Sequence, residues 1–210
     1  MKKAVSLVTI IIFATNINAQ DLQSLDGSIS VTESNSLKII GENEDNQLMV
    51  DSSGDYLQVA VRSKELYVAS LCICNELNEV YVLHASAALG SINYKKEGNN
   101  WTTTQKFDWQ MREEGMDAAT IAKRKKYLDS NGWVANTMGM GQVGETEFII
   151  DRNTFKGELK VAIGLMTAED PNNIVEIPSA GSGDCADQKL VSGDPKSSYL
   201  FSTKNWIHID

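Results

Sequence analysis

The sequence predicts a mainly β protein, an antiparallel β-sandwich of the jelly-roll type with one inserted helix near residues 117–130. Two observations lead to this prediction. Short segments of alternating apolar and polar residues recur at a spacing of roughly ten residues, which is typical of sandwiches and barrels. Clusters of Gly, Asn, Ser and Asp separate these segments and mark turns. Because 42% of the residues are hydrophobic and 22% are charged, a packed core is expected rather than disorder.

The chain begins with a segment typical of a secretory signal peptide, residues 1–19. Two lysines precede an apolar run over residues 4–14, and Ala19 lies at the expected cleavage point before Gln20. The run is shorter than the ~20 apolar residues that cross a bilayer. We therefore expect export to the periplasm or the cell exterior without membrane insertion. The mature chain is expected to form a single sandwich domain over residues 20–210.

The charge balance disfavours two classes of partner. The signal peptide contains two lysines and no acid, so the mature chain retains 17 basic and 28 acidic residues, a formal net charge of −11. Such a surface repels nucleic-acid phosphates and anionic lipids. Nucleic acids and membranes are therefore not expected as partners, whereas a small ligand such as a carbohydrate, or another protein, is compatible with this charge.

Strands are predicted to follow one another from residue 28 to residue 108. Apolar and polar residues alternate over 57–62 and again over 80–85, which is the period of a strand. Residues 66–74 are more continuously apolar, as expected of a central strand buried on both faces. Turn signals separate these runs at 52–55, 75–78 and 98–100.

One helix is predicted over residues 118–130. Asp117 is a favourable N-cap, and Asn131-Gly132 is a stop signal. A basic cluster at 123–126 suits a solvated face near the C-terminal end, where the helix dipole favours cations. The helix contains few apolar residues, so we expect it to lie over one edge of a sheet.

Strands resume after the helix. Alternation over 145–150, a turn over 153–157 and alternation over 159–166 predict a hairpin with one buried face. Residues 179–198 are rich in Ser, Gly and Asp and are predicted to form a long surface loop. A last strand is expected over 199–209.

The three cysteines allow one disulfide. Cys72 and Cys74 lie two residues apart on one predicted strand, so their α-carbons are ~6.6 Å apart, near the limit for a bridge. The feasible disulfide joins Cys185 to Cys72 or Cys74 and leaves the other thiol free. The alternative is that all three are small buried hydrophobic residues. Their spacing is not that of a zinc site.

Several motifs occur in a particular strand order between about residue 50 and residue 170. Gly-Asp-Tyr at 54–56 opens a strand, an apolar strand follows at 67–71, and Glu-Val-Tyr-Val-Leu-His occupies 79–84. Small residues fill 85–90, and Trp101 comes after a further strand. This arrangement resembles the DOMON-like exported sandwiches, which are relatives of the family nine carbohydrate-binding modules.

The resemblance implies a ligand site between the sheets or at their end. Members of that group bind haem or sugars there, and the haem binders use a Met and a His as axial ligands. For haem b, the resemblance implies His84 together with one of Met49, Met138, Met140 or Met166.

His84 is one of two histidines, and it is predicted to share a strand face with Val80 and Val82. Small residues follow it and leave space nearby. It is a candidate ligand for haem or a metal, or a hydrogen-bond donor at the floor of a pocket. The alternative is a core histidine satisfied by its neighbours.

The four tryptophans are candidates for sugar binding because flat aromatic rings stack on the apolar faces of pyranoses. Trp101 and Trp133 each follow a turn, where a scaffold can present a ligand-binding residue, so these two are favoured over Trp109 and Trp206. The alternative is that the tryptophans belong to the core.

Two further groups of residues are candidate sites. Met138 and Met140 alternate with glycines, and they suit an apolar pocket or a thioether ligand to haem iron, or simply a mobile loop. The acidic stretches 41–45 and 181–187 are rich in oxygen ligands but lack the spacing of a calcium-binding loop. A structural Ca²⁺ is therefore an alternative to the prediction of no cofactor.

No motif indicates catalysis: the sequence contains no G-x-S-x-G elbow, no H-E-x-x-H and no Walker sequence. Glu145 and Glu147 are conceivable glycosidase carboxylates, but that reaction needs two carboxyl groups ~5–9.5 Å apart across a cleft. The sequence thus predicts an exported, non-catalytic sandwich that binds a small ligand, carbohydrate before haem. The alternative is an envelope protein that binds another protein, and a hydrolase ranks third.

Overall fold

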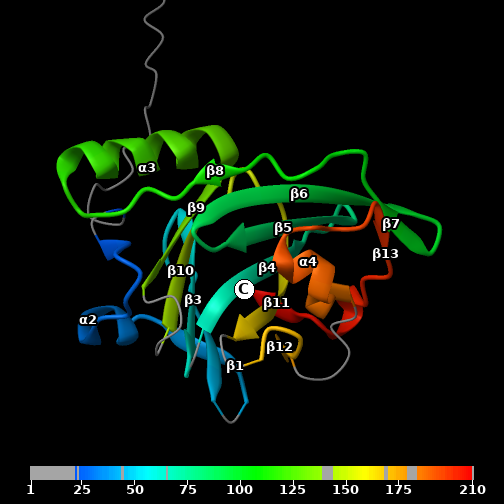
Figure 1. Cartoon of the computed structure of the whole chain (residues 1–210), viewed down its shortest axis with the longest axis horizontal. Coiled ribbons are helices and arrows are strands. Elements are labelled where there is room, and N and C mark those ends of the chain that lie inside the picture. The colour runs from blue at the N-terminus through cyan, green and yellow to red at the C-terminus, as the bar shows by residue number, and fades with distance from the viewer. Residues whose placement is uncertain are drawn as a thin grey trace, which may run out of the picture.

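The computed structural model of the chain is mainly β, with two antiparallel sheets packed against each other and few helices, as the sequence predicts (Figure 1). It describes residue 22 and the ranges 24–43, 45–64, 66–138, 144–167, 170–178 and 184–209. The predicted signal peptide and Met140 lie outside these residues. In the described part of the chain, no helix is long and apolar enough to cross a membrane.

The smaller sheet has five strands in the order β1-β2-β3-β10-β9, all of them antiparallel to their neighbours. Its strands are β1 (Lys38–Asn43), β2 (Asn46–Asp51), β3 (Tyr56–Ser63), β9 (Trp133–Met138) and β10 (Gly144–Asp151).

The larger sheet has nine strands, seven of them in the order β12-β11-β4-β5-β6-β7-β13. β8 adds to β6, and β14 adds to β11. Its strands are β4 (Leu66–Cys74), β5 (Glu79–Ala85), β6 (Ala88–Glu97), β7 (Asn100–Thr102), β8 (Gln110–Met111), β11 (Leu159–Thr167), β12 (Ile174–Ile177), β13 (Ser198–Tyr199) and β14 (Ile207–Ile209).

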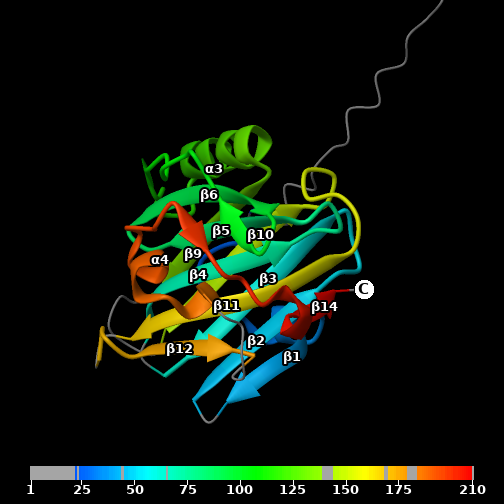
Figure 2. The same cartoon turned by 90° about the vertical axis from the view of Figure 1, so that its right-hand side faces the viewer.

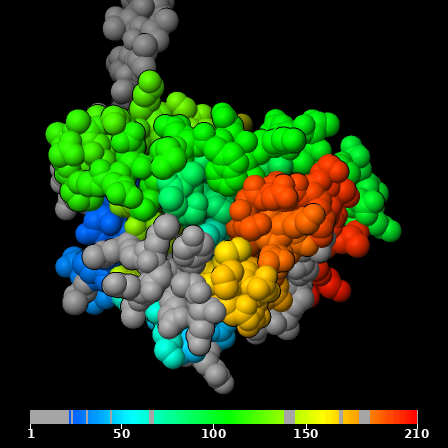
Figure 3. Space-filling model, in the orientation of Figure 1, coloured from blue at the N-terminus to red at the C-terminus, as the bar shows by residue number. Residues whose placement is uncertain are grey.

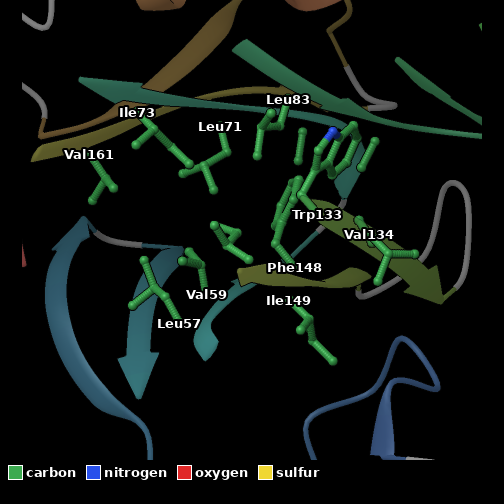
Figure 4. Close-up of a cluster of buried hydrophobic side chains, with 14 of the residues drawn as sticks. Leu57, Val59, Leu71, Ile73, Leu83, Trp133, Val134, Phe148, Ile149 and Val161 are labelled. Atoms are coloured by element: carbon green, nitrogen blue, oxygen red, sulfur yellow. The ribbon is translucent and has the colours of Figure 1, made fainter. Parts of the chain in front are cut away.

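The main core lies between the two sheets. In Figure 4, Leu57 and Val59 from the five-stranded sheet face Leu71, Ile73 and Leu83 from the nine-stranded sheet. All of these side chains are buried, and they occupy alternate positions of their strands, which is why the period-two pattern in the sequence identified them.

A second apolar layer covers the other face of the nine-stranded sheet. β4 lies between β11 and β5 and is buried on both faces, so the prediction of a central strand over residues 66–74 is confirmed. Figure 2 shows α4 (Gln188–Ser192) and the C-terminal segment lying over this face. Their buried residues pack against Val80, Val82 and Tyr94.

The predicted surface loop over residues 179–198 is wrong. The described part of this segment, from residue 184, contains the 3₁₀ helix η1 (Asp184–Ala186), then α4 and the start of β13. Leu190 and Val191 are fully buried because they cover the apolar outer face of the larger sheet. The abundance of Ser, Gly and Asp in the sequence concealed these few apolar anchors.

The predicted hairpin over residues 145–166 is also wrong, because β10 and β11 belong to different sheets. The connection crosses from one sheet to the other and buries Phe155 in the main core. The predicted last strand over 199–209 is three short elements instead: β13, the 3₁₀ helix η2 (Thr203–Asn205) and β14.

The helix prediction is confirmed by α3 (Ala118–Asn131), which contacts the edge strand β9. The Asp117 side chain accepts hydrogen bonds from the first turn of α3, and Gly132 ends the helix with a φ of 76°. One member of the basic cluster departs from the predicted solvated face, because the Arg124 side chain points inward and is buried. A short helix, α2 (Val31–Ser34), precedes β1.

A disulfide joins Cys72 of β4 to Cys185 of η1, one of the two pairings that the sequence allows. The two α-carbons are 6.2 Å apart, and Cys74 is left as a buried free thiol. The bond ties the C-terminal cover to the centre of the larger sheet.

The disulfide is expected to stabilise the fold strongly because it links residues 113 positions apart. In the chain-entropy account, breaking such a link lowers the free energy of unfolding by about 3–5 kcal/mol. We expect that loss in Cys72→Ala/Cys185→Ala, measured by urea unfolding. Reductant should lower the midpoint of the wild-type protein but leave that of the double variant unchanged; equal effects of reductant on both would contradict the assignment.

Candidate functional site

Trp109 is the aromatic residue among the exposed large hydrophobic side chains of the described structure. The segment that follows β7 returns along β6 to β8, and it places Trp109 with 45% of its surface exposed. Figure 3 shows this segment, in green, packed against the orange C-terminal segment that contains α4.

Two glycines make room for the Trp109 ring. A Cβ atom on Gly90 of β6 would lie 2.8 Å from the indole, and one on Gly193, just after α4, would lie 2.7 Å from it. Gly193 also has a φ of +84°, which disfavours any other residue. The indole is therefore seated on backbone contributed by two segments that are distant in the sequence.

His84 lies beneath this ring. The imidazole meets Trp109 edge to face with 4.9 Å between ring centroids, and Phe107 lies 4.6 Å from Trp109. The two ring nitrogens of His84 are hydrogen-bonded to Ser70 Oγ at 3.2 Å and to Ser86 Oγ at 3.1 Å. Burial lowers the pKa of His84 to about 4, so the ring is neutral at physiological pH.

A cavity of about 480 Å³ opens beside Trp109. Phe107 and Trp109 supply its aromatic surface, while residues 103–106 and 193–197 supply Thr, Gln, Lys, Asp and Ser side chains. Its volume falls within the ~300–1,000 Å³ range of small-molecule sites. An aromatic floor with polar walls is suited to a ligand that has both apolar faces and hydroxyl groups.

A second, polar cavity of about 420 Å³ shares residues 103–105 with the first. Asn93, Lys95, Glu97 and Thr102 line the rest of it. The Oδ1 atom of Asn93 is buried and has no hydrogen-bond partner among the described residues. Most buried acceptors in folded proteins have a hydrogen-bond partner, so this one is unusual.

The two favoured tryptophans are not at this site, and their prediction as stacking surfaces is wrong. Trp101 is 2% exposed and packs against Phe201 in the outer layer, and Trp133 is 0% exposed and lies between Tyr127 and Phe148 in the main core. Trp206 is buried as well. The sequence near Trp109 does not distinguish it from the other three tryptophans, because the space for its ring is left by Gly90 and Gly193, which are distant in the chain.

The described residues do not fit a haem. His84 is 3% exposed, and both of its nitrogens are already hydrogen-bonded, so neither faces an open coordination position. Met49 packs with Ala60 on the five-stranded sheet, whereas His84 belongs to the nine-stranded sheet. Met166 is buried against Val68. The side chain of Met138 and the whole of Met140 lie outside the description.

No group of three or more His, Cys, Asp or Glu side chains capable of holding a metal occurs in the described part of the chain. In the acidic stretch near residue 187, Asp187 caps α4 and pairs with Lys196. Residues 181–183 of that stretch are not described.

Glu145 and Glu147 do not face a cleft, so the hypothesis that they are glycosidase carboxylates is wrong. Both project from the outer face of β10 and are covered by residues 24–30, which we call the N-terminal strap. Glu147 is 0% exposed, and Glu145 forms an ion pair with Arg62 at 2.6 Å. A substrate therefore cannot reach Glu147, and the two carboxylates do not face each other across a cleft.

A scan against protein-family models gave no match to this chain, and searches of curated proteins and of solved structures gave none. The resemblance to DOMON-like sandwiches therefore stays a prediction.

Replacing Gly193 is expected to displace Trp109. In Gly193→Ala, the added methyl group meets the indole and the backbone is strained, so we expect a shift in tryptophan emission and a loss of about 1–3 kcal/mol in unfolding free energy. The matched control is Gly54→Ala, where a Cβ has no neighbour closer than 3.9 Å. Unchanged emission in Gly193→Ala would show that the ring is not seated there.

Proposed function

We propose that this is an exported, non-catalytic protein that binds carbohydrate in the cavity beside Trp109. The observation that supports this proposal is a half-exposed indole at a cavity with polar walls. A pyranose ring places its C–H groups on such an aromatic face, while its hydroxyl groups bond to neighbouring polar side chains. Gln105, Asp194 and Ser197 line the same cavity and supply donors and acceptors of the required kinds.

His84 is proposed to act through Trp109 and not on the ligand. It is buried beneath the indole and held by two serine hydroxyls, so it supports the ring from below. Because its pKa is lowered to about 4, it carries no charge above about pH 5, and the support stays the same across the physiological range.

The serine next to His84 does not resemble an activated nucleophile. The Ser86 hydroxyl donates to the carbonyl of Ala88 and accepts from the Ala88 N–H, so its hydrogen is not directed at His84. An activated serine donates its hydrogen to the base. The Nδ1 atom of His84 is then left to accept from the Ser70 hydroxyl, but Ser70 is fully buried and out of reach of a substrate. Together these contacts support a binding role over a hydrolytic one.

The second cavity suggests a ligand longer than one sugar ring. It adjoins the first through residues 103–105, and the side chains that line it, Asn93 among them, are polar. We therefore propose an oligosaccharide with one ring on Trp109 and a neighbouring ring near Asn93.

Export is supported by two independent features. The first is the signal-peptide pattern of residues 1–19. The second is the Cys72–Cys185 disulfide, a bond that persists in oxidising compartments such as the periplasm and the cell exterior.

Trp109→Ala tests the proposal directly. Binding to the sugars selected on a glycan array should weaken at least about 10-fold, because the stacking surface is removed. The matched control is Met111→Ala, which removes a more exposed apolar side chain two residues away and outside the cavity lining, and it should bind like wild type. A blank array for the wild-type protein would reject carbohydrate and favour a protein partner.

Chain length tests the second cavity. Calorimetry with one to six units of the selected sugar should show affinity rising from one unit to two or three. Asn93→Ala should weaken the longer ligands about 5-fold, the loss of one hydrogen bond, and leave the single sugar unaffected. Ser91→Ala, two residues earlier on β6 and outside the cavity, is the control. Equal affinity at all lengths would restrict the site to the Trp109 cavity.

A further inference from the structure

The N-terminal strap, residues 24–30, is attached to the protein mainly through its main chain. Its Gly27 N–H donates to Glu147 at 2.9 Å, and its Ile29 N–H donates to Glu145 at 2.6 Å. The Leu25 carbonyl accepts from Arg124 at 2.8 Å and from Asn136 at 3.2 Å. Figure 1 shows the strap and α2 beside β10.

The strap also seals an apolar surface. Val134 and Ile149 point away from the main core toward this face (Figure 4), and Leu25 is fully buried where the strap covers it. Further along, Ile29 packs with Met49 and Ala60. The strap therefore separates both the buried carboxylate of Glu147 and several apolar side chains from water.

Glu147 is the critical group in this attachment because it is fully buried and, among the described residues, accepts hydrogen bonds from the Gly27 N–H and from the Gln58 amide at 3.1 Å. Charged groups from several elements surround it: Asp26 of the strap, Glu33 of α2, Glu145 of β10 with its partner Arg62 of β3, and Arg124 of α3 with Arg112 nearby. Arg62 pairs with Glu145, and Arg124 donates to the Leu25 and Glu113 carbonyls. Among the described residues no ion pair reaches Glu147, and Glu33 and Asp26 oppose its negative charge.

We propose that Glu147 is a proton-controlled latch: its protonated form keeps the N-terminal strap closed on the sheet, and its ionisation opens the strap. Opening hydrates the carboxylate and separates it from Asp26 and Glu33. Opening also exposes Leu25 and Ile29 and frees the Leu25 carbonyl from Arg124 and Asn136.

The direction of the pH effect follows from the two states. With the strap closed, burial raises the pKa of Glu147 from 4.5 to about 8, and repulsion from Glu33 and Asp26 contributes to this shift. In the open strap the carboxyl is hydrated and its pKa returns to about 4.5. The closed state therefore holds a proton that the open state releases, so opening is favoured as the pH rises from about 4.5 to about 8 and levels off above that.

Limited proteolysis of the oxidised mature protein measures strap opening. When the strap recloses faster than it is cut, the rate of cleavage within residues 24–37 reports the open population. Between pH 5.5 and 9.5 this rate should rise on the order of 100-fold, after correction for the protease rate on an unstructured peptide of the same sequence. The remainder of the chain should stay intact by mass spectrometry.

Glu147→Gln should flatten this pH profile, whereas Glu145→Gln, the neighbouring carboxylate, should keep its slope. If Glu147→Gln fails to fold, the carboxyl carbon of Glu147 in the wild-type protein can be followed by NMR, and a midpoint near pH 8 is expected. A midpoint near 4.5, parallel proteolysis profiles for wild type and Glu147→Gln, or cleavage spread over the whole chain would each overturn the proposal.

Discussion

The structure depends on the burial of the nine-stranded sheet on both of its faces. Along β4, Leu71 and Ile73 point to one face and Cys72 and Cys74 to the other, and all are buried. The five-stranded sheet can cover only one of these faces. The other face therefore requires the C-terminal segment. This segment pairs with the sheet through the short strands β13 and β14, and its buried apolar residues and the Cys72–Cys185 bond hold the rest of it in place.

The candidate site is a consequence of where this second cover ends. Trp109 lies at the margin between the cover and the segment that follows β7, so one part of the ring is packed and the rest is in solvent. The same layer buries His84, and that burial keeps its imidazole neutral. Burial by a covering segment also shifts a pKa on the outer face of the five-stranded sheet, where the strap buries Glu147 and raises its pKa.

Local chemistry in the sequence predicted the fold class, the central strand over 66–74 and both ends of α3, because alternation and caps act within a few residues. It could not predict that β10 and β11 belong to different sheets, since a strand's period is the same whichever sheet contains it. The choice of Trp101 and Trp133 over Trp109 failed for a related reason: exposure of an aromatic ring is determined by segments that are remote in the chain.

The location of the second cover at residues 184–209 has a consequence for how the protein is made. A chain synthesised from the N-terminus contains all of the five-stranded sheet and most of the nine-stranded sheet before this segment appears. Until then Val82 and Tyr94 face solvent, and Cys72 has no sulfur to pair with. The newly made chain thus passes through a stage with an exposed apolar surface and a free Cys72 thiol, and a chaperone has access to this surface during that interval.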